Sequence, residues 1–212
     1  GDEVAEEAGK ILAKIDGRGL PEPSVWMKGP GGVFPNKEPW EKVSERYLFV
    51  DELAALRSRI KHPGELERFD YWLHTYQYMR TLGELGCLRG QMDKMAEQIA
   101  KEQDHARAKQ MARGLLEQRI RLSRLWEVAI SQQLKAADTP GEMGTIDNLE
   151  RHSRLTQQFL TKHDELMEKT LGAPLPQEIE LSKEYMNPAR MTVPTVRTQV
   201  RNGEPLRLRI LI

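Results

Sequence analysis

The feature of this sequence that most constrains its fold is a helical spacing of apolar residues that begins at about Trp40 and continues to residue 172. Apolar side chains recur every three or four positions, which is the period of a helix with one buried face. Long helices joined by short connections favour antiparallel bundle packing. The spacing predicts four helices, over about 40–62, from 64 past 99, over about 104–136, and after the break at 138–144 (DTPGEMG) as far as 171.

The first 39 residues combine a helix with a long irregular segment. Apolar spacing predicts the helix from about Asp2 to Ile15. The segment 17–39 holds five of the 12 prolines and five of the 16 glycines, a density that excludes a regular element. Because it also carries Trp26 and Phe34 as apolar anchors, we expect a packed Pro/Gly-rich loop.

The C-terminal residues change to a strand pattern. Two β-prone runs, MTVPTVRTQV and LRLRILI, flank Asn202-Gly203, a common hairpin turn. Because two strands alone are marginally stable in water, we expect further strands downstream and interpret the chain as a fragment of a longer protein. The predicted fold is mainly α, with an N-terminal helix and loop over 1–39, an antiparallel bundle of long helices over 40–172, and a linker with a short β-hairpin over 173–212, the start of a truncated β domain.

Composition narrows the possible partners and chemistry. Lys plus Arg and Asp plus Glu both total 32, so the formal net charge is zero, which disfavours nucleic acids and acidic membranes as partners. Cys87 is the only cysteine, which excludes an intramolecular disulfide and a metal site built from several cysteines. No run approaches the 18 or so apolar residues of a membrane span. A single cysteine fits a reducing compartment and also fits a bacterial extracytoplasmic protein, so it does not identify the cellular compartment.

An aromatic run, ERFDYWLHTYQYMR at 67–80, holds five of the 13 Phe, Trp and Tyr residues. Large rings on two faces of one helix predict a central helix that is packed on both sides. The rings could be core, or they could form a platform for a ligand or a neighbouring domain. One face carries Phe69, Trp72, Tyr76 and Met79, and another carries Tyr71, Thr75 and Tyr78.

Three glycines follow on one face of the same predicted helix, Gly83, Gly86 and Gly90. Each costs about 1 kcal/mol of helix propensity relative to alanine. Either a groove for a closely approaching helix or ring, or a kink, would explain them.

Sequence patterns for catalysis and metal binding are weak. Glu102 and His105 form an E-x-x-H pair, half of the set that a di-metal bundle uses, but no second pair follows. The setting of Cys87 is typical of a small buried residue rather than an activated thiolate. His152 and His163 fit core or boundary positions. We predict no catalytic residue, no metal ligand and no cofactor.

Several stretches resemble the region that follows the catalytic (β/α)₈ barrel in large bacterial glycoside hydrolases. They are EEAGKILAKIDG, GLPEPSVWMKGPGGVFPN, FVDEL and LERFDYWLHTYQYMR, while YMNPARMTVPTVRTQVRNGEPLRLRILI resembles the opening of a β-sandwich in such proteins. The resemblance implies a polysaccharide-degrading parent enzyme outside the cytoplasm, whose catalytic carboxylates lie upstream of this chain. Its partners would be other domains of the same polypeptide and polysaccharide.

If the chain touches sugar, an indole or phenol ring can stack on a pyranose while its polar edge forms hydrogen bonds. We therefore expect a non-catalytic accessory domain of a glycoside hydrolase. The alternatives are a helical protein–protein interaction or self-association module unrelated to sugars, and a metal-binding bundle enzyme. The candidate substrate-binding residues are Trp26, Trp40, Trp72, Tyr76 and Tyr78.

Overall fold

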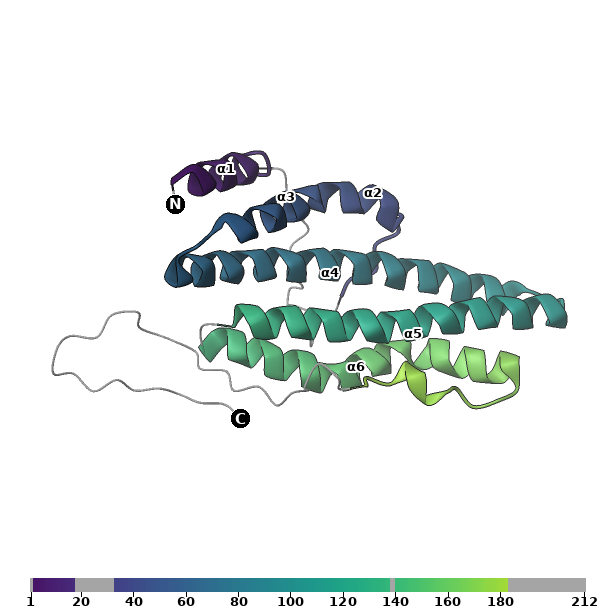
Figure 1. Ribbon diagram of the computed structural model, residues 1–212. Coiled ribbons are helices and arrows are strands. Elements are labelled where there is room, and N and C mark those ends of the chain that lie inside the picture. Colours follow the sequence, from purple (N-terminus) through teal and green to yellow (C-terminus); the bar gives the residue numbers. More distant parts are fainter. Residues whose placement is uncertain (1, 18–32, 138–139, 183–212) are drawn as a thin grey trace.

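The computed structural model describes residues 2–17, 33–137 and 140–182, and these are mainly helical, as predicted (Figure 1). Short 3-10 turns lie at Glu45–Tyr47, Arg57–Arg59 and Gln177–Ile179. The α-helices are α1 (Asp2–Ala13), α2 (Trp40–Ser44), α3 (Leu48–Leu56), α4 (Pro63–Lys101), α5 (His105–Ala136) and α6 (Pro140–Leu171).

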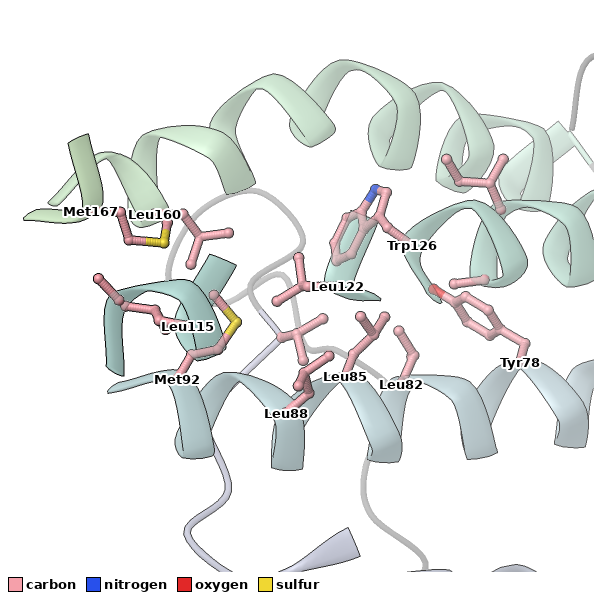
Figure 2. Packing of buried hydrophobic residues seen from close by; sticks show 14 of the residues in the cluster. Tyr78, Leu82, Leu85, Leu88, Met92, Leu115, Leu122, Trp126, Leu160 and Met167 are labelled. Atoms are coloured by element: carbon pink, nitrogen blue, oxygen red, sulfur yellow. The ribbon is translucent and has the colours of Figure 1, made fainter. Parts of the chain in front are cut away.

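Helices α4, α5 and α6 lie side by side with alternating directions and form an antiparallel bundle (Figure 1). Helix α5 begins where the sequence predicts, because the carboxylate of Asp104 accepts hydrogen bonds from the backbone N–H groups of Ala106 and Arg107. Apolar residues between the three helices form the first core cluster (Figure 2), which includes Leu85, Leu88, Met92, Leu115, Leu122, Trp126, Leu160 and Met167.

A second layer covers the other side of α4, where α2 and α3 pack on α4 and α1 packs on α3 (Figure 1). Val43, Tyr47, Val50, Leu53 and Leu73 belong to the second core cluster in this layer. Helix α4 is therefore central and packed on both sides, as the aromatic run predicted.

The prediction of a single helix over 40–62 is wrong in detail. The structure divides it into α2, a 3-10 turn, α3 and a second 3-10 turn at Arg57–Arg59. Turns with 3.0 and 3.6 residues place positions three and four apart on nearly the same face, so apolar spacing alone cannot separate these conformations.

The glycine face of α4 is a groove, and α4 runs unbroken from Pro63 to Lys101. A Cβ at Gly83 would lie 2.7 Å from the hydroxyl of Tyr47, and a Cβ at Gly90 would lie 2.0 Å from the carbonyl oxygen of Asn36. The N–H of Asn36 donates to the carbonyl of Gly86 at 2.8 Å. Of the two explanations for the glycines, the close approach of a neighbouring segment is confirmed.

Residues 173–182 lie along α5, held by a group of buried and half-buried polar side chains. Arg119, 1% exposed, donates to Asp164 Oδ1 at 3.0 Å and to the carbonyl of Ile179 at 3.1 Å. Arg124 donates to the carbonyls of Glu178 and Glu180 at 2.8 and 2.7 Å. The predicted β-hairpin falls within 183–212, outside the described residues, and stays a prediction.

Candidate functional site

Among the described side chains of the long helices, the most exposed large ring is that of Trp72, near the start of α4, with 55% of its surface accessible. Its ring stacks on that of Tyr76 one helical turn later, with centroids 6.1 Å apart and planes inclined by 28°. Tyr71 meets the Trp72 ring edge-on at 5.2 Å. We call Tyr71, Trp72 and Tyr76 the aromatic platform.

Several contacts fix the platform in place. Phe49 of α3 packs edge-on against Tyr76 at 5.2 Å, so Tyr76 is anchored on the second core cluster. The hydroxyl of Tyr71 donates to Glu142 of α6 at 2.7 Å. Rings held by neighbours on two other helices lose little freedom when a ligand binds, which favours affinity.

Beside the platform lies a hollow of about 550 Å³, which is wide open to solvent. This α1 hollow has one wall from the end of α1 and the turn that follows, and one from Tyr76 of α4. Its volume falls within the range of about 300–1,000 Å³ that small-molecule sites occupy. The lining residues are Gly9, Leu12, Ala13, Ile15, Asp16, Gly17 and Tyr76.

The hollow has few polar side chains. Burial raises the pKa of Tyr76, so its hydroxyl stays protonated near neutral pH and can both donate and accept a hydrogen bond. Among the described residues, none is hydrogen-bonded to this hydroxyl. Asp16 is exposed at the rim, while the nearby Lys14 is engaged by Glu52 at 3.1 Å.

The other candidate rings have different surroundings. Tyr78 is 6% exposed and belongs to the first core cluster, on the same side of α4 as Leu82 and Leu85 (Figure 2), so its ring has no free face for a sugar. Trp40 is half-buried, with its ring 5.9 Å from that of Tyr47. Trp26 lies outside the described residues. Of the four candidates in the described part of the chain, Trp72 and Tyr76 alone are brought together.

The described residues that were considered for catalysis or metal binding are buried or make contacts within the helical scaffold. Cys87 is 4% exposed, and burial raises the pKa of its thiol, which disfavours a reactive thiolate. Glu102 accepts hydrogen bonds from the N–H groups of Gln103 and Asp104 in the α4–α5 connection. His163 of α6 contacts Asp93 of α4 at 2.9 Å. The side chain of His152 lies outside the described part.

Across the described ranges, no group of three or more His, Cys, Asp or Glu side chains could hold a metal ion. Within the same ranges, none of the helices combines the length and apolar character needed to cross a membrane.

Sequence reasoning missed the α1 wall of the hollow and the buried Arg119. No local signal places the end of α1 beside Tyr76, because the two segments are distant in the chain. Arg119 did leave a signal. It follows Leu115 by four positions and precedes Leu122 by three, so a cation stands in the middle of an apolar helix face.

No family model, curated protein or solved structure matches the chain.

Proposed function

We propose that the chain is a non-catalytic, structural helical domain of a larger carbohydrate-active enzyme, a glycoside hydrolase located outside the cytoplasm. The domain would support the catalytic barrel and contribute Trp72 and Tyr76 as contacts to polysaccharide. The observation that carries this proposal is the stacked Trp72–Tyr76 pair, with Trp72 more than half exposed, on the helix that contributes to both core clusters.

The indole of Trp72 is 55% exposed and therefore accessible to a ligand. A sugar ring can cover it with its apolar C–H face, while its hydroxyls remain hydrogen-bonded. A long helix anchored on both sides holds such a ring in one orientation, as a binding site requires.

Affinity electrophoresis of the 212-residue chain in gels that contain soluble polysaccharides tests the proposal. We expect retardation by at least one neutral polymer, and Trp72→Ala should weaken it about thirtyfold or more, because truncating a tryptophan anchor at a binding hot spot costs about 2 kcal/mol or more. Phe34→Ala is the matched control, since Phe34 is 57% exposed but lies outside the platform. Retardation that survives Trp72→Ala would argue against the platform.

A hydrolysis assay with the same polymers tests the non-catalytic part of the proposal. Steady turnover by the purified chain, not removed by further purification, would contradict it.

The second candidate is a helical protein–protein interaction or self-association module unrelated to sugars. The exposed apolar side chains available to such an interface include Leu48 (58%), Val128 (43%) and Trp72, on three different helices. Light scattering separates the two candidates. A stable oligomer that Trp72→Ala dissociates would favour the second, whereas a monomer that binds polysaccharide favours the first.

A further inference from the structure

Tyr76 belongs to two features at once. One side of its ring contributes to the aromatic platform through Trp72, and the same residue forms the α4 wall of the α1 hollow. Tyr76 therefore links the aromatic platform to the α1 hollow.

The walls of the hollow combine apolar surface with two hydrogen-bonding side chains. Leu12, Ala13 and Ile15 supply aliphatic contact, while Asp16 supplies a carboxylate and Tyr76 a hydroxyl. A carboxylate accepts hydrogen bonds from hydroxyl groups, and such charge-assisted bonds are about twice as strong as neutral ones. The hydroxyl of Tyr76 can bond to a sugar hydroxyl in either direction.

We propose that the polysaccharide site extends from Trp72 over Tyr76 into the α1 hollow, and that it selects saccharides without acidic groups. This inference rests on the proposed function above and specifies its ligand class. Asp16 binds the hydroxyls of a neutral sugar residue, and Tyr76 contributes both its ring and its hydroxyl.

The charges around the hollow determine the selectivity. None of the described lining residues is a cation, so a uronate or sulfate in the hollow would face the Asp16 carboxylate without a counter-charge from them. Two cations of this layer are already paired with carboxylates: Lys14 contacts Glu52 at 3.1 Å, and Arg59 binds both carboxylate oxygens of Glu7 at 2.6 and 2.8 Å. Like charges brought together at a binding site oppose binding.

The experiment compares neutral polymers, such as a mixed-linkage glucan, a xylan and a mannan, with polygalacturonate and alginate, using the full 212-residue chain. We expect measurable binding to a neutral polymer and at least about tenfold weaker binding to both acidic ones. Asp16→Asn keeps the size of the side chain but removes its charge. It should weaken binding to the neutral polymers about three- to tenfold and reduce the difference in affinity between neutral and acidic polymers.

Two further variants locate the site. Tyr76→Phe removes one hydroxyl and keeps the ring, so we expect neutral binding to weaken by less than Trp72→Ala weakens it. Glu3→Gln is the charge control, because Glu3 is exposed on α1 but is not among the residues that line the hollow, and binding should not change. Circular dichroism of each variant confirms that the helices are retained.

The outcomes separate the two levels of the proposal. Neutral binding that depends on Trp72 but is unchanged by Asp16→Asn and Tyr76→Phe would overturn the extension into the hollow and leave the proposed function intact. Acidic polymers bound as tightly as neutral ones would overturn the selectivity alone. No retention by any saccharide in the series would overturn both the site and the proposed function.

Discussion

The two sides of α4 differ in what they bury. The side that faces α5 and α6 contributes aliphatic and thioether side chains, such as Leu85 (1% exposed) and Met92 (fully buried), to the first core cluster. The side that faces α1–α3 contributes rings and glycines, and near Tyr76 it opens to solvent. One helix therefore provides close packing on one side and accessible aromatic surface on the other.

The polar contacts show the same contrast. Between α5 and α6, Arg119 is almost fully buried and binds Asp164, Ser123 and the carbonyl of Ile179. Around α1 and α3 the ion pairs are exposed, among them Arg59–Glu7 and Lys14–Glu52. Exposed pairs contribute little to stability, whereas a buried charge that loses its partner is costly. The bundle should therefore dominate the free energy of unfolding.

The largest effect should come from Arg119→Ala. The substitution leaves the Asp164 carboxylate without its buried donor, while the Ile179 carbonyl keeps its hydrogen bond from the Ser123 hydroxyl. Removing one partner of a buried ion pair costs about 3–5 kcal/mol in comparable cases. Urea unfolding followed by circular dichroism measures the loss. Arg121→Ala is the control, because Arg121 pairs with Glu84 at 2.6 Å on the surface and should cost at most about 1 kcal/mol. Equal losses of unfolding free energy in the two variants would contradict the contrast between buried and exposed polar contacts.

Gly90→Ala should have the next largest effect, on the N-terminal side. Its Cβ would lie 2.0 Å from the backbone oxygen of Asn36, so the segment 33–39 must move and lose the Asn36–Gly86 hydrogen bond. We expect a net destabilisation of about 1–3 kcal/mol, the usual cost of overpacking.

Gly114→Ala is the matched control for Gly90→Ala. Its Cβ would meet only the flexible Met95 methyl at 3.4 Å, and alanine gains up to about 1 kcal/mol of helix propensity. Urea midpoints that rise for both variants would mean that the groove is not filled as described.

A smaller, pH-dependent effect is expected at Asp164. Burial raises the pKa of this carboxyl, an effect that the neighbouring Arg119 and His163 only partly offset and that Glu168 reinforces. The folded state then binds the proton more tightly than the unfolded state, so stability falls as pH rises from about 4, the ordinary aspartate pKa, through the raised value.

Asp164→Asn removes this titration. The advantage of the parent chain over the variant should shrink as the pH rises from about 4 toward neutrality, by about 1.4 kcal/mol for each pKa unit that separates the folded and unfolded states. Urea unfolding of both chains across that interval measures it. An advantage that grows with pH would mean that ion pairing to Arg119 outweighs burial.

Two of the three long helices, α4 and α5, could be predicted with their starts because their apolar stripes are continuous and local signals mark where they begin, Pro63 for α4 and Asp104 for α5. The sequence also offered a groove for a closely approaching helix or ring as one explanation of the glycines over 83–90. The occupants of the groove could not be predicted, because Tyr47 and Asn36 reach it through contacts between segments distant in sequence.

The candidate site was predictable only as a set of rings. Trp72 and Tyr78 lie on the same helix in the same aromatic run, yet one is 55% exposed and the other 6%. The difference depends on which face α5 and α3 cover, and no local pattern encodes it. In the sequence, Asp16 is recognisable only as the residue before a glycine that ends a helix. Its position in the hollow depends on how α1 packs.

The smallest effect, and the finest test of the contrast, concerns how α1 is held. Arg59→Gln removes the two hydrogen bonds to Glu7 of α1, a pair in which both side chains are more than 40% exposed and screened by solvent. Hydrogen exchange of the α1 amides should therefore rise by no more than about fivefold, with no change in the urea midpoint. Arg57→Gln is the matched control, because Arg57 pairs with Asp70 of α4 and its loss should leave α1 exchange unchanged. A lowered midpoint with Arg59→Gln would show that the outer layer and the bundle unfold together, and that α1, which forms one wall of the hollow, is as firmly fixed as the core.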